Sequence, residues 1–354
     1  MAPTGNCNRI LQIHPTRRCN LRCLHCYSSS GPQERDELSV ALLLKAITDA
    51  SAQGYTVVSF SGGEPLLYKP LLELLEHAHR CQMLTTVASN GMLLDEQSLE
   101  KLCSTVDLLA ISLDGMPASH NRMRASPQAF ETMAARLEGV RQSGIPFGFI
   151  FTLTHHNFRE LDWVANFALE QGARLLQIHP LQEVGRARQR LVGGRPNSSH
   201  SAYAYLKAMR LQKAVGDRLH VQIDLAHQDF LRSNPSSVFA GMSLTDEIQC
   251  PFADILSPLI IEADGTVVPI QHGLAREYAL GNLREASLRE LTTHWRRERY
   301  PSFLELCRRV FEEVTTPADF PITDWYEAIA RQAENGVAIV KLVFEEQASN
   351  VSDY

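Results

Sequence analysis

The sequence Cys19-Asn20-Leu21-Arg22-Cys23-Leu24-His25-Cys26-Tyr27 carries three cysteines in a C-x3-C-x2-C pattern. Such short spacing lets one loop bring its sulfur atoms to one face of a metal centre. A four-iron cluster is normally held by four cysteine thiolates, so three thiolates would leave one iron with an open coordination position. A structural zinc ion is the alternative, with Cys7 or His25 as fourth ligand, because zinc binds four Cys or His ligands in short-spaced pairs. The motif therefore indicates a metal site and leaves the metal open.

Length and charge exclude several classes of protein. A chain of 354 residues is long enough for one large domain and a smaller one. Its formal net charge of -6 argues against a general nucleic-acid surface. The sequence has no apolar run as long as a membrane span and no signal peptide at its start. We therefore expect a cytoplasmic protein without nucleic-acid or membrane partners, in which clustered cysteines indicate metal binding or catalysis.

Stretches typical of strands and helices alternate along the first half of the chain. Apolar and β-branched residues predict strands at 9–14, 56–60, 84–88, 108–113, 147–154 and 175–179. Amphipathic spacing predicts helices at 37–53, 66–80, 95–104, 128–143 and 158–171. This alternation is typical of parallel βαβ units. Six such units predict an α/β fold, a partial (β/α)6 barrel of the TIM type.

Glycines and polar residues gather at the predicted carboxyl ends of these strands, where function is concentrated in parallel α/β proteins. Glycine lets the backbone approach a ligand closely, and Ser, Asn or Asp can bind hydroxyls and an amino-acid head group. Each feature alone is explained by an ordinary turn, but together they favour a cofactor site over structural zinc. The residues at these ends are the cysteine loop, Gly62-Gly63-Glu64, Ser89-Asn90, Ser112 with Asp114, and His179.

This constellation resembles the radical S-adenosylmethionine (SAM) superfamily, whose fold is a partial (β/α)6 barrel, over residues 10–184. The resemblance implies that Cys19, Cys23 and Cys26 form the catalytic centre by holding a [4Fe–4S] cluster, whose fourth iron chelates the amino and carboxylate groups of SAM. It also implies a set of residues that bind SAM. These are Tyr27 beside the adenine, Gly62, Gly63 and Glu64 at the amino group, Ser89 and Asn90 at a neighbouring strand end, Ser112 and Arg124 at the ribose and carboxylate, and Ile178 at the adenine through its backbone.

The second half of the chain resembles the SPASM/twitch extension of many radical SAM enzymes. After a further helix at 203–215 and a strand at 220–225, residues 259–269 predict a β-hairpin with an Asp-Gly turn. Members of that group usually carry a cysteine just after the hairpin's proline, where this chain has Ile270. Cys250 and Cys307 alone are too few to hold a four-iron cluster through thiolates, and whether they or His272 bind a metal is left open.

We therefore expect two parts. Residues 8–235 would form the barrel, and residues 236–354 would form a smaller α+β extension that has lost its metal and helps to close the barrel. Further helices are predicted at 288–297 and 324–344 in that extension. His14 and His179 lie at strand ends and are candidate acid/base groups facing the substrate, although hydrogen-bonded core histidines are the more common explanation.

The resemblance implies an enzyme that cleaves SAM reductively and uses the 5′-deoxyadenosyl radical to abstract hydrogen from a substrate C–H bond. Relatives with such extensions commonly modify ribosomally made peptides, and this is the favoured function. The alternative is radical SAM chemistry in the biosynthesis of tetrapyrroles of the haem type or of small metabolites. A non-catalytic barrel scaffold is the third hypothesis, and the intact motifs argue against it.

Two kinds of partner protein follow from the resemblance. A low-potential electron donor of the flavodoxin or ferredoxin type is expected, beside the peptide or small-molecule substrate. The first strand begins near Arg9, so no peptide-recognition domain is expected before the barrel, and a separate protein would have to recognise a leader peptide if one is needed.

Overall fold

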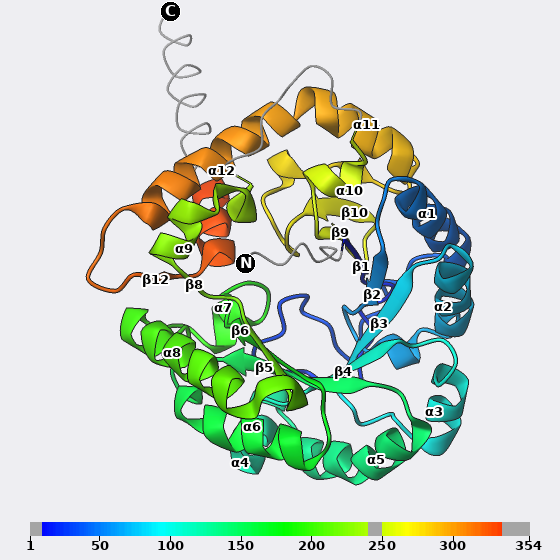
Figure 1. The fold of residues 1–354 in the computed structure, drawn as a ribbon. Coiled ribbons are helices and arrows are strands. Elements are labelled where there is room, and N and C mark those ends of the chain that lie inside the picture. The colour runs from blue at the N-terminus through cyan, green and yellow to red at the C-terminus, as the bar shows by residue number, and fades with distance from the viewer. Residues whose placement is uncertain (1–8, 240–249, 335–354) are drawn as a thin grey trace, which may run out of the picture.

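The computed structural model describes residues 9–239 and 250–334, and its centre is one curved sheet (Figure 1). Ten strands form this sheet, in the order β11-β10-β9-β1-β2-β3-β4-β5-β6-β7. The strands from β1 to β7 are all parallel to their neighbours. Their bounds are β1 (Ile10–Ile13), β2 (Val57–Phe60), β3 (Leu84–Ser89), β4 (Leu108–Ser112), β5 (Phe147–Leu153), β6 (Leu175–Pro180) and β7 (His220–Ile223). The predicted α/β class and partial barrel are confirmed, and the further predicted strand continues the same sheet as β7.

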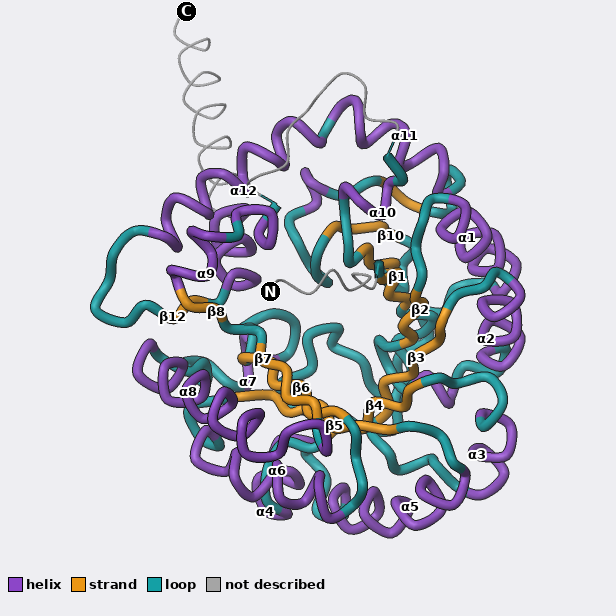
Figure 2. Tube along the Cα trace, in the orientation of Figure 1, coloured by secondary structure: helices purple, strands orange, loops and turns teal. Residues whose placement is uncertain are grey.

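Helices cover the outer face of the sheet, as Figure 2 shows. Most of them connect one parallel strand to the next, as the alternating pattern predicts. The predicted helices 66–80 and 158–171 each begin with a separate short turn, η1 (Pro65–Leu67) or η2 (Phe158–Glu160). The helices of the barrel are α1 (Val40–Ala52), α2 (Leu71–Arg80), α3 (Glu96–Leu102), α4 (Pro117–Arg124), α5 (Ala129–Ser143), α6 (Leu161–Glu170), α7 (Ala187–Arg190) and α8 (Ser198–Val215).

Helix α1 illustrates how local sequence sets these elements. The Ser39 side chain caps its first turn by accepting a hydrogen bond from the backbone N–H of Leu42. Leu43 and Ile47, four residues apart, are fully buried on the sheet-facing side. Each buried aliphatic side chain contributes about 2 kcal/mol through removal of apolar surface from water. The cap therefore starts the helix, and the apolar stripe fixes which face lies on the sheet.

Helix α4 was not predicted from the sequence. Apart from Pro117 and Ala118, Met123 is the only apolar residue among its eight, so no amphipathic stripe marks it. Pro117 at its first turn pre-sets a helical φ, and Ala125 ends it in a left-handed conformation with a φ of 52°. This short helix has consequences for the site, because it carries Arg124 as its last residue.

The C-terminal part joins the barrel through the predicted hairpin. Strand β9 (Leu259–Ile261) pairs in parallel with β1 and antiparallel with β10 (Thr266–Pro269), which pairs with β11 (Gly281–Asn282). Asp264 and Gly265 form the turn, where the Asp264 carboxylate accepts a hydrogen bond of 2.9 Å from the N–H of Thr266. The hairpin is confirmed, and it continues the sheet of the barrel beyond residue 235. The division into two parts at 235/236 stays a prediction.

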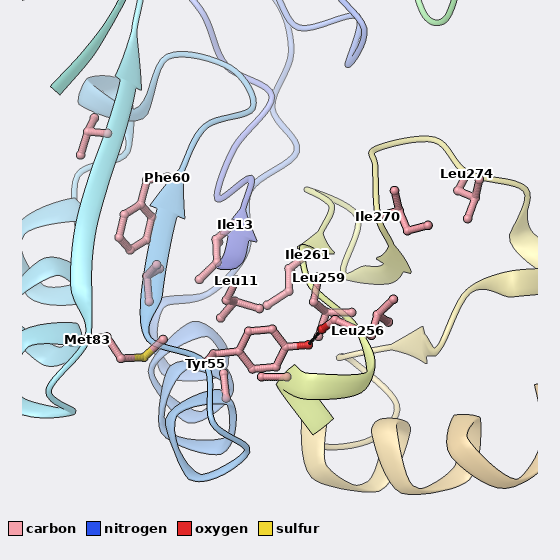
Figure 3. Packing of buried hydrophobic residues seen from close by; sticks show 14 of the residues in the cluster. Leu11, Ile13, Tyr55, Phe60, Met83, Leu256, Leu259, Ile261, Ile270 and Leu274 are labelled. Carbon is pink, nitrogen blue, oxygen red and sulfur yellow. Dashed lines mark hydrogen bonds between the residues drawn. The ribbon is translucent and has the colours of Figure 1, made fainter. Parts of the chain in front are cut away.

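The two parts share apolar contacts where β9 meets β1 (Figure 3). Leu11 and Ile13 of β1 and Leu259 and Ile261 of β9 are fully buried in one cluster. The hydroxyl of the buried Tyr55, just before β2, donates a hydrogen bond of 2.7 Å to the carbonyl of Leu256. These contacts hold the hairpin in place at the edge of the barrel.

Helices and short strands complete the C-terminal part across the open side of the ring (Figure 1). Helix α12 was not predicted, and the predicted final helix is described only for residues 325–334. The rest of that prediction lies outside the described residues. No described helix is both long and apolar enough to cross a membrane. The remaining elements are η3 (Gly216–Arg218), β8 (Ala226–His227), α9 (Gln228–Ser233), η4 (Pro235–Val238), α10 (Phe252–Ile255), η5 (Arg276–Tyr278), α11 (Leu288–Glu298), α12 (Tyr300–Thr315) and β12 (Ile322–Thr323).

Candidate functional site

The cysteine loop lies between β1 and α1, at the carboxyl end of the first strand. Cys19 and Cys23 are buried with Leu21, and Cys26 and Met92 pack against them. All three cysteines are free thiols. Leu21 donates its N–H to the sulfur of Cys19 at 3.4 Å, which holds the first turn of the loop. The loop thus gathers the three predicted ligands in one small apolar environment.

Burial makes the thiols of Cys19 and Cys23 hard to ionise when no metal is bound. It raises the pKa of Cys19 to about 12, and the neighbouring Glu64 carboxyl and the other two thiols add to the shift. Burial also raises the pKa of Cys23, although the Arg124 charge acts in the opposite direction. Thiolates in such a place need compensating positive charge, which the irons of a cluster supply. The three cysteine side chains therefore fit an iron–sulfur cluster, whose irons bind thiolates.

The zinc alternative requires side chains that converge on a single ion. Within residues 9–239 and 250–334, no three His, Cys, Asp or Glu side chains form a group that could hold one metal ion. A cubane cluster makes a different demand, because each cysteine binds a different iron and the thiolates surround the cluster. Of the fourth zinc ligands considered, Cys7 lies outside the described residues. His25 faces Asp114, with 3.8 Å between its Nε2 and the carboxylate, and burial lowers its pKa to about 4.

Glu64 connects the second and third strand ends to the cysteine loop. It is 1% exposed, and its carboxylate accepts hydrogen bonds from the Ser89 hydroxyl at 3.0 Å and the Asn90 N–H at 2.9 Å. The Asn90 amide in turn donates to the side-chain oxygen of Asn20, between the first two cysteines, at 2.7 Å. Burial raises the pKa of Glu64 to about 7, while these hydrogen bonds lower it. The carboxylate has further lone pairs for a ligand donor.

The two glycines before Glu64 allow the second strand end to touch the cysteine loop. A Cβ atom on Gly63 would lie 2.2 Å from the carbonyl oxygen of Arg18, and one on Gly62 would lie 2.7 Å from the Cβ of His14. Gly62 also has a φ of +97°, which side chains other than glycine rarely adopt. The backbone N–H of Glu64 donates to the Arg18 carbonyl at 2.9 Å. Glycine is therefore needed here for backbone-to-backbone contact.

Arg124 lies between the fourth strand end and the cluster loop. Its Nε is 2.7 Å from the Asp114 carboxylate, and its Nη1 is 3.8 Å from the sulfur of Cys23. Burial raises the pKa of Asp114, but the Arg124 charge outweighs burial and brings it down to about 2, so the pair is ionised. Neither Arg124 Nε nor Asp114 Oδ2 has a well-aligned hydrogen-bond partner among the described residues. The two groups thus form a buried ion pair beside a predicted cluster ligand.

Tyr27 belongs to a cluster of rings that spans both parts of the chain. Its hydroxyl lies 3.0 Å from that of Ser61, and its ring centroid lies 5.6 Å from that of His14 and 5.0 Å from that of His272. The two histidine rings stack at 5.1 Å, and the Nε2 of His272 is 3.8 Å from the Glu262 carboxylate. Burial lowers the pKa of His14 well below its usual value, and the nearby His272 lowers it further. His14 is 1% exposed, as the packed-histidine explanation requires.

Two predicted SAM-binding residues lie apart from this network. The Ser112 hydroxyl, at the end of β4, makes no hydrogen bond with any other described residue. Ile178 is fully buried in the apolar core, and its carbonyl accepts a hydrogen bond of 3.0 Å from the N–H of Asp224. Their predicted roles stay predictions.

Cys307, Cys250 and His272, the possible metal ligands of the extension, lie in three different environments. Cys307 is fully buried in α12, where burial raises its pKa, and Cys250 lies within reach of Arg296, whose Nη2 is 3.6 Å from its sulfur. His272 packs on His14 and Tyr27 instead.

His179 forms a second polar group at the carboxyl end of β6. It pairs with the Asp224 carboxylate just after β7. Burial lowers the pKa of His179, but the Asp224 charge and hydrogen bond outweigh it and raise the pKa overall. Nearby, burial raises the pKa of Asp324 to about 7, and the Asp224 charge raises it further. The His179 side chain is 37% exposed, so this histidine differs from the enclosed His14.

The family comparison agrees with this geometry. The sequence profile of the Radical SAM superfamily matches residues 13–168, which contain the cysteine loop, Glu64 and Arg124. The chain contains a radical SAM domain. Domains of this superfamily bind a [4Fe–4S] cluster and SAM, and they belong to enzymes. The predicted family, cofactors and enzyme class are therefore confirmed.

Relatives of the radical SAM domain include enzymes with different products. The Fe-coproporphyrin III synthase of Methanosarcina barkeri is 32% identical over 48% of this chain and 43% of its own. The sporulation killing factor maturation protein SkfB of Bacillus subtilis is 26% identical over 78% of this chain and 62% of its own. The chain thus spans about half the length of these curated relatives.

A solved structure extends the likeness of fold over nearly all of the chain. The structure of anSMEcpe with bound AdoMet and Cp18Cys peptide superposes with a TM-score of 0.63, covering 97% of this chain and 99% of that one. At 18% sequence identity, the likeness concerns the fold.

Sequence reasoning missed several residues around the radical SAM site. Asn20 links the loop to Asn90, and its position between two cysteines was the only local signal. Arg186 lies in a connector that reads as a loop, yet it donates to the carbonyls of Cys23 at 2.8 Å and Ser30 at 2.6 Å. Asp224 lies inside the predicted strand 220–225, and no local pattern marked it as a partner of His179.

Proposed function

We propose that this chain is a radical SAM enzyme that modifies a ribosomally made peptide at an unactivated C–H bond. The observation that carries the chemistry is the convergence of Glu64 and Arg124, from different strand ends, on one loop with three free thiols. The peptide substrate is supported by the maturation protein SkfB and by the peptide complex of anSMEcpe. The alternative, tetrapyrrole chemistry, is supported by the coproporphyrin synthase.

Different residues of the site would bind the cluster and orient SAM. Cys19, Cys23 and Cys26 would hold the cluster, which, when bound, supplies the electron that cleaves SAM to methionine and the 5′-deoxyadenosyl radical. Glu64 would accept a hydrogen bond from the SAM amino group. Arg124 would donate paired, charge-assisted hydrogen bonds to the SAM carboxylate.

The remaining assigned residues would complete the SAM site. Ser89 and Asn90 act by positioning Glu64, since both already donate to its carboxylate. The backbone at Gly62 and Gly63 would lie against the methionine end of SAM, and Tyr27 would flank the adenine. Ser112 would bind the ribose, and the backbone at Ile178 would meet the adenine.

The extension would enclose the radical. Residues 8–235 would form the reacting barrel, and residues 236–354 would cover it, with His272 packed on Tyr27 at the cofactor side. Excluding water protects a reactive intermediate from side reactions. A cytoplasmic location would suit the site, because thiols stay reduced there.

SAM binding should tighten with pH. Because Glu64 has a pKa of about 7, most of it is protonated near pH 6, and the carboxylate that would accept the SAM amino group forms as the pH rises. We expect the affinity for SAM to rise roughly five- to tenfold from about pH 6 to about pH 7.5. Calorimetry on the cluster-loaded enzyme measures this, together with the release of up to one proton.

The Glu64→Gln variant is the control for this pH effect. It keeps a side-chain oxygen for Ser89 but cannot ionise, so its affinity should be lower and independent of pH over this range. An unchanged pH slope in Glu64→Gln would assign the effect to another group and remove Glu64 from the SAM amino group.

His179 should act in the later, substrate-dependent part of the reaction. A histidine held by a carboxylate is suited to accept a proton from a substrate group. In His179→Gln we expect roughly a hundredfold loss of product while SAM cleavage without product continues. Parallel measurement of product and 5′-deoxyadenosine tests this; equal loss of both would place His179 in folding or SAM binding instead.

The substrate class can be tested directly. The cluster-loaded enzyme is incubated with SAM and dithionite, either with a short peptide encoded beside its gene or with iron coproporphyrin. Peptide-dependent stimulation of 5′-deoxyadenosine and a mass change in the peptide support peptide modification. Decarboxylated porphyrin would establish the alternative, and no SAM cleavage under any condition would contradict both.

A further inference from the structure

An open pocket with a volume of about 290 Å³ is lined in part by the cysteine loop. Three segments that are distant in sequence meet there: the cysteine loop, the end of α4, and α7. The residues that line it are Arg22, Leu24, Ala125, Arg186, Gln189 and Arg190. The lining therefore combines three guanidinium groups, and it includes no carboxylate from the described part of the chain.

The positive charge of this pocket is available to a partner. Arg22 and Arg190 are exposed, and Arg186 is half-buried. None of the three forms a salt bridge with another residue in the ranges that the structure describes. The positive charge of this pocket contrasts with the net charge of -6 that the chain carries as a whole. An acidic partner would be repelled by most of the surface and attracted to this place.

The pocket lining packs against a small buried apolar cluster. Met123 at the end of α4, Leu181 after β6, and Ala187 and Leu191 around α7 form a small buried cluster, with Leu24 of the pocket lining packed against it. The N–H of Leu24 donates to the Met123 carbonyl at 2.8 Å. The lining is therefore held in one arrangement before a partner binds, which reduces the entropy cost of binding.

Arg186 connects the pocket to the cluster loop. Its guanidinium donates to the carbonyls of Cys23 and Ser30, and its backbone N–H donates to the carbonyl of Cys26 at 2.9 Å. Gly185 fits because a Cβ atom there would lie 2.1 Å from the Tyr27 carbonyl oxygen. One wall of the pocket is thus one hydrogen bond from the backbone of two predicted cluster ligands.

We propose that this arginine pocket is the docking site of an acidic, low-potential electron-transfer protein of the flavodoxin or ferredoxin type. The proposal rests on the proposed function, since only a redox cluster behind Cys23 and Cys26 needs such a partner there. In the step served by docking, the reduced partner loses one electron and the cluster of this chain gains it. No atom is transferred.

The size and chemistry of the pocket suit a transient redox complex. Electron-transfer pairs bury little surface and dissociate quickly, so a few exposed charges around a small contact are sufficient. Charges of this kind mainly raise the association rate, and salt screens them within about 8 Å at physiological ionic strength. The pocket thus predicts weak binding that depends strongly on salt.

Binding of purified flavodoxin to the cluster-loaded enzyme tests the proposal without reference to activity. The variant is Arg190→Glu, on the exposed rim of the pocket, and Gln189→Glu is a milder second variant. Arg210→Glu, at an exposed position of α8, makes the same charge change away from the pocket and is the matched control. We expect Arg190→Glu to weaken binding roughly tenfold and to flatten its salt dependence, with a smaller loss in Gln189→Glu and little in Arg210→Glu.

A kinetic ratio accompanies the binding measurement. For each protein, 5′-deoxyadenosine formation with reduced flavodoxin is divided by that with dithionite, a small reductant that needs no docking. We expect this ratio to fall roughly tenfold in Arg190→Glu relative to the wild type. Unchanged binding in both pocket variants, or equal weakening in Arg210→Glu, overturns the docking site.

Two other outcomes are also decisive. If Arg190→Glu weakens binding of the peptide substrate and leaves flavodoxin binding unchanged, the pocket belongs to the substrate and the proposal fails. If the wild-type protein forms no 5′-deoxyadenosine even with dithionite, the proposed function fails, whatever the flavodoxin affinities are.

Discussion

Replacing Cys23 by alanine is expected to abolish both iron binding and SAM cleavage. The variant would leave two thiols in the loop and would remove the sulfur that lies 3.8 Å from Arg124. We expect iron to fall from about four atoms per chain to less than about one, because two thiolates do not hold a cubane cluster. The formation of 5′-deoxyadenosine should fall by at least about a thousandfold. Anaerobic reconstitution, iron and sulfide counting and product chromatography measure these changes.

Cys103 provides the matched control. It is an exposed free thiol at the end of α3, and its sulfur donates to the Glu100 carbonyl at 3.1 Å. Cys103→Ala should keep the full iron content and activity. Retained iron and activity in Cys23→Ala would remove the cluster from this loop and with it the proposed function.

The Gly63→Ala variant should destabilise the protein and disturb the cluster loop. The added Cβ would lie 2.2 Å from the Arg18 carbonyl oxygen, a backbone atom that can move only with the loop. We expect a loss of roughly 1–3 kcal/mol in the free energy of unfolding, the range for forced backbone shifts in packed regions. Iron content should also fall, because Arg18 directly precedes Cys19. Chemical denaturation of the metal-free protein isolates the first effect.

Gly31→Ala is the control for Gly63. An added Cβ at Gly31 would lie 3.5 Å from the Cγ of Arg22, an ordinary contact with a flexible side chain. This variant should therefore stay within about 0.5 kcal/mol of the wild type. Similar stability of the two variants would mean that the loop relaxes easily around Gly63 and that its close approach is unimportant.

The barrel was predictable because its signals are local. Alternating apolar stretches and amphipathic segments mark each strand and helix within a few residues, and parallel pairing follows from their order. Helix α4 lacks an apolar stripe and was missed for that reason. The pairing of β9 with β1 joins residues about 250 positions apart, and no local pattern encodes such a contact.

Only those parts of the site that lie in short sequence motifs could be predicted. The cysteines and Glu64 stand in recognisable short patterns, so their positions on strand ends could be expected. The hydrogen bonds that hold the motifs together join distant residues, such as Asn20 with Asn90 and Arg186 with Cys23. Their separations are 70 and 163 positions. Such partners emerge only when the sheet brings its strand ends to one edge.

The most direct test of the radical SAM site is the metal and product content of the reconstituted protein. The protein is purified without oxygen and loaded with iron and sulfide, and its metals are counted while 5′-deoxyadenosine is assayed with SAM and dithionite. We predict about four irons per chain, no bound zinc, and SAM cleavage. About eight irons would show that Cys250, Cys307 or His272 hold a second cluster in the extension. Bound zinc with no SAM cleavage would contradict the proposed chemistry altogether.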